Sequence, residues 1–87
     1  MQMMLITGDH DLAIGARMSG MLTKEVNATQ NAQSAWEDAI RMKDLALITV
    51  TDDVAGALTK EVDMFHQTHS MPLVVVLPLN EMRRRHG

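Results

Sequence analysis

Short apolar runs alternate along this chain with longer segments in which apolar residues recur at helical spacing. Three of the runs, at residues 3–7, 45–51 and 73–77, are too short for helices and end at glycine, proline or polar residues. Runs of this kind are typical of strands that are buried on both faces. A fourth, polar run at residues 26–29 predicts a weaker strand at a sheet edge.

The segments between these runs predict three helices. The first is expected at about residues 12–22, after a capping carboxylate from Asp9 or Asp11. Its two glycines, Gly15 and Gly20, each weaken a helix by about 1 kcal/mol and are expected to mark close packing or a helix end. Its recurring apolar positions are Ile14, Met18 and Met21.

The second and third helices carry clearer apolar stripes. The second is expected at residues 32–43, where Arg41 and Lys43 in the last turn complement the helix dipole. Its stripe consists of Ala32, Ala35, Trp36, Ala39 and Ile40. The third is expected to start after a cap at Thr51 and to end at a turn over residues 66–72. Its apolar face consists of Val54, Leu58, Val62 and Phe65.

This order of elements predicts an α/β fold. Strands that alternate with helices form crossover units, and right-handed crossovers place helices on both faces of a parallel sheet. We therefore expect a three-layer α/β/α arrangement, Rossmann-like and receiver-like in shape, with four parallel strands in the order 2-1-3-4. The 87 residues allow one domain, residues 1–87, in which residues 79–87 form a short C-terminal tail.

Composition and charge narrow the classes of function. The net charge is −3 and the basic cluster Arg83-Arg84-Arg85 comes at the end of the chain, which argues against nucleic-acid binding. The chain has no cysteine, and no apolar stretch approaches the ~20 residues of a membrane-spanning helix. The first six residues lack the basic region of a signal peptide, so we expect a cytoplasmic location. The nine methionines suit either an adaptable contact surface or an irregular core.

Acidic residues after the expected strands are the first candidates for chemistry. Asp9, Asp11 and Asp52 stand at the strand ends where parallel α/β sheets bind ligands, much as the Mg²⁺-binding carboxylates of receiver domains do. A receiver domain also has a fifth strand and a lysine after its last strand, and no lysine follows residues 73–77 here. The alternative is that these aspartates cap helices and interact with helix dipoles.

No other pattern indicates an active site. The loop from Thr7 to Asp11 has one glycine, so it matches neither the dinucleotide-binding nor the P-loop pattern. The histidines are scattered, and His66 and His69 have no evident third partner for a metal. We therefore expect no catalytic residue, no cofactor and no metal.

Two stretches of the chain resemble the F subunit of the V/A-type rotary ATPases. The first has the spacing of the family's D-x-x-T-x-x-G-F-R-L-A-G stretch at Asp9, Gly15, Arg17 and Gly20. It departs at Ala16 and Met18, which replace an aromatic residue and a leucine. The second, residues 47–51 and then 71–78, is similar to the family's strand, helix and P-L-V-x-x-x-P ending. Together the resemblance covers about residues 3–78.

The resemblance implies a non-catalytic rotor subunit of the central stalk. Such a subunit couples ATP turnover to ion transport by binding the D subunit, which is the long helical hairpin of the stalk. It has no cofactor and meets the membrane only through the complex. The candidate interface residues are then Arg17, Met18, Met21, Arg83 and Arg84. Chains of the family usually continue past the last strand into a C-terminal helix, whereas residues 79–87 leave room for one or two helical turns.

Two other functions stay open. A receiver-like shape also suits a small regulatory or signalling module. A divergent protein of the same fold could instead form a homodimer through its sheet edge or through a Met-lined helix face.

Overall fold

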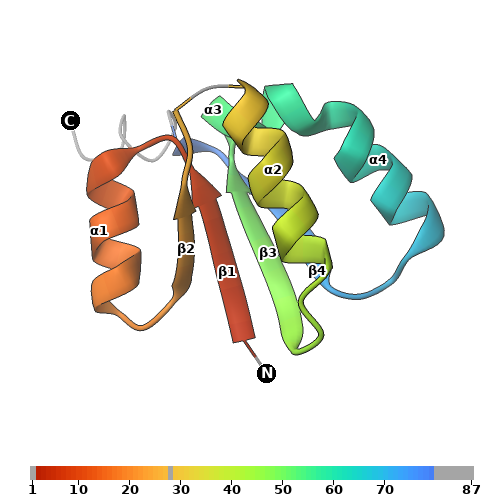
Figure 1. Cartoon of the computed structure of the whole chain (residues 1–87), viewed down its shortest axis with the longest axis horizontal. Helices are drawn as coiled ribbons and strands as arrows, with labels where there is room; N and C mark the ends of the chain where they lie inside the picture. Colours follow the sequence, from red (N-terminus) through yellow and green to blue (C-terminus); the bar gives the residue numbers. More distant parts are fainter. Residues whose placement is uncertain (1, 28, 80–87) are drawn as a thin grey trace.

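Four parallel strands form the sheet of the described part of the chain, in the order β2-β1-β3-β4 (Figure 1). The structure is a computed structural model and describes residues 2–27 and 29–79. The strands are β1 (Gln2–Thr7), β2 (Leu22–Glu25), β3 (Leu45–Thr51) and β4 (Leu73–Leu77). The predicted α/β class, parallel pairing and strand order are confirmed.

The helices lie on the two faces of this sheet. One face carries α1 (His10–Met18), which packs over β1 and β2. The other face carries α2 (Thr29–Ile40), α3 (Asp52–Ala55), the 3-10 turn η1 (Gly56–Leu58) and α4 (Thr59–Thr68). This division follows from the strand order, because the crossover from β1 to β2 runs in one direction and the later crossovers run in the other.

The larger core lies between the sheet and α2, η1 and α4. The strands contribute residues such as Met4, Ile6, Ile48, Val50 and Val74. The helices contribute Ala32, Ala35, Trp36, Ala39, Val54, Leu58, Val62 and Phe65, so the predicted apolar face of the third helix is confirmed as buried. The rings of Trp36 and Phe65 meet edge to face with their centroids 5.6 Å apart, which joins α2 to α4.

The predicted edge strand at residues 26–29 is wrong in position, because β2 is formed by Leu22–Glu25 and α1 already ends at Met18. Gly20 adopts a φ of 90°, a conformation that suits glycine, and turns the chain out of the helix. Met21 therefore lies in the turn before β2 rather than on a helix. Side chains then alternate along β2: Lys24 pairs with Asp38 of α2, and the next residue, Glu25, faces α1.

Two other helix bounds differ from the prediction. α2 ends at Ile40, where the N–H of Met42 bonds to the carbonyl of Ala39 in a tighter turn, so Arg41 and Lys43 lie beyond the helix. The predicted third helix is divided into α3, η1 and α4, with the tighter turn starting at Gly56. Its periodicity survives this change because the 3-10 turn is only three residues long.

Most of the expected C-terminal tail, including Arg83 and Arg84, lies outside the described residues. Its first residue, Leu79, is buried, and its backbone N–H donates to Oδ1 of Asp52 at 3.3 Å. Within residues 2–27 and 29–79, no helix is both long and apolar enough to cross a bilayer.

Candidate functional site

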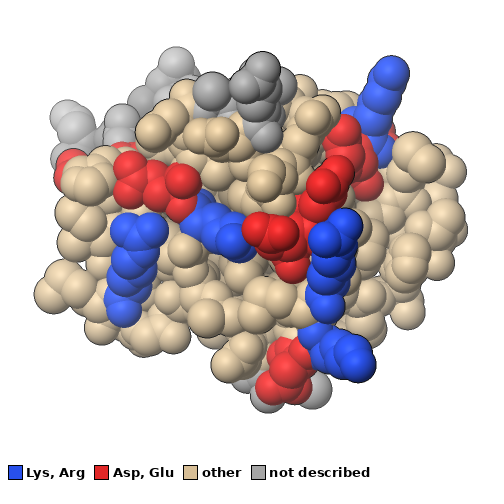
Figure 2. Space-filling model, viewed as in Figure 1, with Lys and Arg blue, Asp and Glu red and all other residues tan. Residues whose placement is uncertain are grey.

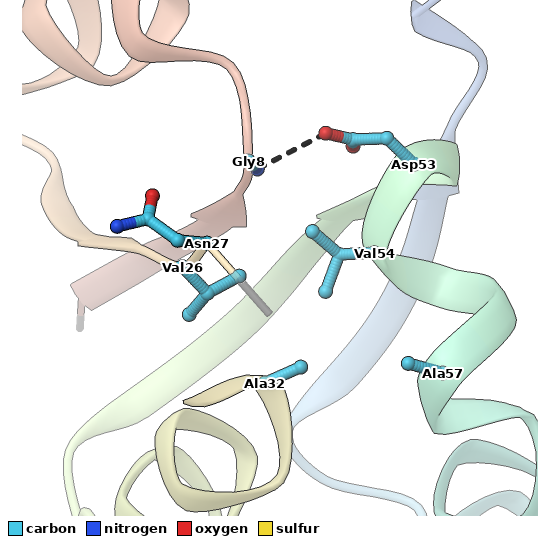
Figure 3. Close-up of a pocket in the computed structure, with 7 residues that line it drawn as sticks. All are labelled: Gly8, Val26, Asn27, Ala32, Asp53, Val54 and Ala57. Carbon is cyan, nitrogen blue, oxygen red and sulfur yellow. Dashed lines mark hydrogen bonds between the residues drawn. The ribbon is translucent and has the colours of Figure 1, made fainter. Parts of the chain in front are cut away.

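The carboxyl ends of β1 and β3 are joined by a small group of hydrogen bonds, of which Figure 3 shows the one between Gly8 and Asp53. The N–H of Gly8 donates to Oδ2 of Asp53 at 3.1 Å, and the Thr51 hydroxyl donates to Oδ1 of the same carboxylate. The hydroxyls of Thr7 and Thr51, both fully buried, are hydrogen-bonded to each other at 2.9 Å. Asp53 therefore links the two strand ends with both of its oxygens.

A hollow of about 370 Å³ lies beside this joint. It occupies the point where the strand order reverses, between β1 and β3, which is the usual ligand site of an open α/β sheet. Its lining consists of Gly8, Val26, Asn27, Ala32, Asp53, Val54 and Ala57. Asn27 and Asp53 are the polar side chains in this lining, and both oxygens of Asp53 already accept hydrogen bonds. None of the described residues that line the hollow offers a cationic group for a phosphate.

Two of the three aspartates of the receiver hypothesis, Asp9 and Asp52, bind separate parts of the backbone. Asp9 is the N-cap of α1 and accepts from the N–H of Asp11 at 3.3 Å, so the prediction that Asp9 caps this helix is confirmed. Asp52 accepts from the N–H of Leu79. In the described residues, no three acidic or histidine side chains are grouped so that they could hold a metal ion.

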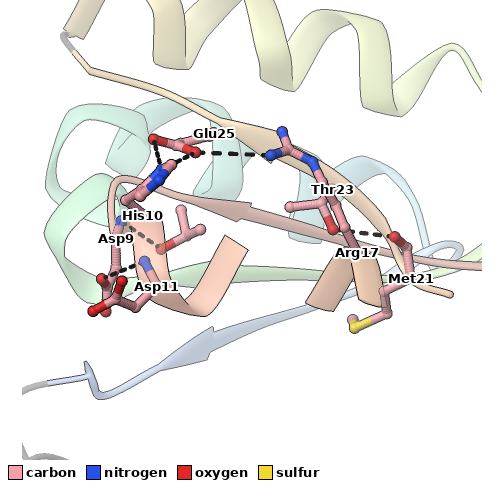
Figure 4. A network of polar contacts seen from close by, with 8 residues as sticks. Asp9, His10, Asp11, Arg17, Met21, Thr23 and Glu25 are labelled. Atoms are coloured by element: carbon pink, nitrogen blue, oxygen red, sulfur yellow. Dashed lines mark hydrogen bonds and ion pairs between the residues drawn. The ribbon is translucent and has the colours of Figure 1, made fainter. Parts of the chain in front are cut away.

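Arg17, a candidate interface residue, forms part of a polar network between α1 and β2 (Figure 4). Its guanidinium lies 3.8 Å from Oε1 of Glu25, and Nδ1 of His10 lies 3.0 Å from the same oxygen. Half of the Arg17 side chain is exposed, so this ion pair contributes little to stability. The contact braces the end of α1 against β2, and the remaining exposed surface is available to a partner.

The two candidate methionines lie in different surroundings. Met18 is 84% exposed at the end of α1. Met21 is half-buried and lines a shallow hollow of about 220 Å³ together with Met3 and the turn residues Ser19 and Gly20. Met18 thus supplies an exposed apolar side chain, whereas Met21 belongs to the floor of a depression beside the first strand.

Exposed apolar residues on β1 and β4 are a feature that the sequence analysis misses. Met3, Leu73 and Val75 are 50%, 56% and 41% exposed, although their runs predict strands buried on both faces. The strand order could have predicted this exposure, because it places one crossover helix, α1, on this face and the other described helices on the opposite face. One short helix covers only half of a four-stranded sheet.

The charged side chains show no segregation by sign on the side of the molecule seen in Figure 1. Figure 2 shows acidic and basic groups interspersed there, in agreement with the ion pair of Lys24 and Asp38 at 3.4 Å. The described residues on this side therefore present no extended basic surface of the kind that a nucleic-acid backbone requires.

Comparisons with known proteins identify a family and a similar fold. A family model described as ATP synthase (F/14-kDa) subunit matches residues 4–87. A solved structure, that of the F subunit of the V-type ATP synthase from Archaeoglobus fulgidus, is similar with a TM-score of 0.68 and 22% sequence identity, over 88% of this chain and 98% of that chain. At this identity the likeness shows a shared fold. No curated protein sequence gives a significant match.

Proposed function

The chain belongs to the ATP synthase (F/14-kDa) subunit family, and on this basis we propose that it is a non-catalytic rotor subunit in the central stalk of a V/A-type rotary ATPase. The observation that carries the proposal is the family match over residues 4–87. In this function the chain turns with the stalk and couples ATP turnover to ion transport. It works at the cytoplasmic side of the membrane and reaches the membrane only through the complex.

The partner in this proposal is a long helical-hairpin stalk protein, the counterpart of the D subunit of rotary ATPases. The exposed methionine and arginine at the end of α1, Met18 and Arg17, are proposed to contact it, together with Met21 in the following turn. Methionine suits such a surface because its flexible, polarisable side chain adapts to an irregular partner. Arg83 and Arg84 are proposed as additional contacts to acidic groups of the complex.

The geometry at the carboxyl ends of the strands supports a non-catalytic function. Asp53 is held by Gly8 and Thr51, Asp9 caps α1, and Asp52 binds the backbone of Leu79. A general acid or base must be able to reach a substrate proton, and a metal site needs converging ligands. These carboxylates instead satisfy backbone and hydroxyl donors of the chain itself.

Single-molecule rotation tests the proposal directly. Because the chain has no cysteine, a Lys60→Cys variant provides one attachment point for a bead on the exposed surface of α4. In an assembled complex whose catalytic ring is fixed to glass, we expect this bead to rotate stepwise when ATP is added. A bead on the catalytic ring is the stationary control. A bead on Lys60→Cys that stays still while the stalk rotates would show that the chain is not part of the rotor.

A further inference from the structure

Half of one sheet face is left uncovered by the described helices. The strand register places Met3, Leu47 and Leu73 in one lateral row, and Leu5, Thr49 and Val75 in the next. In the second row exposure increases from Leu5, which is buried beneath α1, through half-buried Thr49 to Val75. In the first row Met3 and Leu73 are exposed and Leu47 between them is half-buried. On the opposite face of β4, Val74 is 6% exposed and Val76 is 45% exposed. The described helix on this face, α1, packs on β1 and β2, so no helix among residues 2–27 and 29–79 lies over the floor formed by β3 and β4.

The side of α1 that overlooks this floor carries two small residues, Gly15 and Ser19, beside the half-buried Leu12. Arg17 reaches Glu25 of β2, so its side of the helix faces away from β3. At 100° per residue, Gly15 and Ser19 lie on the side opposite Arg17, towards β3. A Cβ atom added at Gly15 would meet nothing within 4 Å. An incoming backbone could approach α1 closely along this side.

The open sheet face beside α1, called the groove below, has the width of one α-helix. Neighbouring strands are about 4.8 Å apart, so β3 and β4 together offer a floor about 10 Å wide, which is the diameter of a helix. Parallel sheets of this class are normally covered by helices on both faces. A helix lying beside α1 would complete the layer that α1 begins.

The charges at one end of the groove define the partner further. Asp9, Asp11 and Asp52 lie at the carboxyl ends of β1 and β3 and make that end of the groove acidic. Arg17, the arginine of α1, faces β2 and therefore does not neutralise these carboxylates. The complementary helix has an apolar stripe for the floor and Lys or Arg residues at the end that meets these carboxylates.

We propose that this groove, with Leu47, Thr49, Leu73 and Val75 as its floor and Gly15 and Ser19 as its wall, binds one helix of the helical-hairpin stalk protein. The inference rests on the proposed function and adds the surface to it; Arg17, on the opposite side of α1, does not contact this helix. The hollow lined by Met3 and Met21 continues the groove at its other end, so Met21 contacts the same helix.

Charge substitutions on the two faces of β4 test the groove. Leu73→Lys with Val75→Lys places two charges on the floor, and Val76→Lys places one on the opposite face of the same strand, at a side chain that is also about half exposed. Because all three side chains are partly exposed, we expect both variants to fold. For binding to the purified stalk protein, we expect the double variant to raise the dissociation constant about a hundredfold. We expect Val76→Lys to raise it by no more than about threefold.

Two further measurements do not depend on these variants. Gly15→Leu should fold, since its side chain enters open space, but it should weaken binding at least tenfold because the leucine blocks the wall of the groove. Gly56→Leu is the control: its side chain also enters open space, but on the other face of the sheet, so it should not weaken binding. In peroxide footprinting of the wild-type complex, Met3 should be protected while Met64 on α4 stays reactive, although both are exposed in the free chain.

The outcomes separate the groove from the proposed function. If the stalk protein fails to bind the wild-type chain at all, both are wrong. If it binds the wild type and the Leu73→Lys, Val75→Lys variant equally, and Met3 still oxidises in the complex, the groove is wrong and the rotor function stands. If the free wild-type chain is a dimer that protects Met3 and the double variant is a monomer, the occupant is a second copy and the proposal is overturned.

Discussion

At the scale of single residues, Asp53 shows how a carboxylate at a ligand-binding edge can serve the fold instead. Oδ2 accepts from the backbone of Gly8 and Oδ1 from the hydroxyl of Thr51. Hydrogen bonds to a charged group contribute about 1.5–3 kcal/mol where they are shielded, and less where water competes. Because both oxygens are engaged, the side chain fixes the ends of β1 and β3 relative to each other.

Gly8→Ala is expected to disturb this joint. A Cβ atom at this position would lie 2.6 Å from Oδ2 of Asp53 and 3.3 Å from the carbonyl oxygen of Val26. The carboxylate must move, which weakens its bonds to Gly8 and Thr51, so we expect a loss of about 1–2 kcal/mol in the free energy of unfolding. Urea denaturation followed by the fluorescence of Trp36, the chain's one tryptophan, measures this loss.

Gly15→Ala is the matched control for this substitution. Gly15 lies inside α1 with open space around its Cβ position, so alanine should leave the free energy unchanged or raise it by about 0.5–1 kcal/mol. Equal losses in the two variants would show that the contact with Asp53 is not the cause.

Capping residues and turns could be predicted from the sequence, but the atoms that surround each glycine could not. Asp9 was predicted as a possible cap and Gly20 as a possible helix end, and both are confirmed. The suggestion that Gly15 marks close packing is wrong for the chain by itself, because nothing lies within 4 Å of its Cβ position. Spacing along a helix shows where a glycine stands, but only the neighbouring elements show what it touches.

At the scale of elements, strands with continuous apolar runs were the easiest to predict. β3 and β4 have the predicted bounds, and β1 begins one residue earlier than expected. The edge strand β2 was misplaced because its residues, Leu22–Glu25, alternate weakly and continue the apolar spacing of α1. Only the turn at Gly20 separates the two elements, and a single glycine does not decide between a weakened helix and a helix end.

The aromatic contact between α2 and α4 leads to a prediction at this scale. Trp36 is 3% exposed and meets Phe65 edge to face, so Trp36→Ala removes the largest side chain that α2 contributes to the core. Such a truncation costs about 3–5 kcal/mol. A domain of this size has only about 4–13 kcal/mol of stability in total. We therefore expect a large drop in the midpoint of thermal unfolding, measured by circular dichroism at 222 nm.

The control for this prediction is the next residue along the chain. Glu37 is exposed on the outer side of α2, so Glu37→Ala should change the free energy of unfolding by no more than about 0.5 kcal/mol. A Trp36→Ala variant that unfolds at the same temperature as Glu37→Ala would contradict the described packing of α2 on α4.

At the scale of the whole molecule, alternation of strands and helices was enough to predict the topology. The order 2-1-3-4 also determines that, of the described helices, one face receives only α1, yet the apolar runs were interpreted as buried on both faces. The sequence of β4, with five consecutive apolar residues, does not distinguish a strand covered by its own chain from one covered by a partner. Burial in an assembly and burial in a core select the same residue types, and only the count of helices per face separates them.

If the groove is filled by a partner helix, the stability of this chain depends on the partner's concentration. A ligand that binds only the folded state stabilises it by RT ln(1 + [L]/Kd), about 2.7 kcal/mol at a concentration of 100 Kd. For a domain of this size each kcal/mol raises the midpoint of unfolding by about 4–8 °C. We therefore expect the midpoint of thermal unfolding to rise by about 10–20 °C when a tryptophan-free stalk protein is added. The fluorescence of Trp36 measures this midpoint. The rise should grow with the logarithm of the partner's concentration.

The control for this rise is the variant with a charged floor. Leu73→Lys with Val75→Lys should unfold near the wild-type temperature alone, because both side chains are partly exposed in the free chain. It should gain little from the partner, since its apolar floor now carries charge that a helix would have to desolvate. A wild-type midpoint that does not move at any partner concentration would mean that the open face of the sheet is not where the stalk binds.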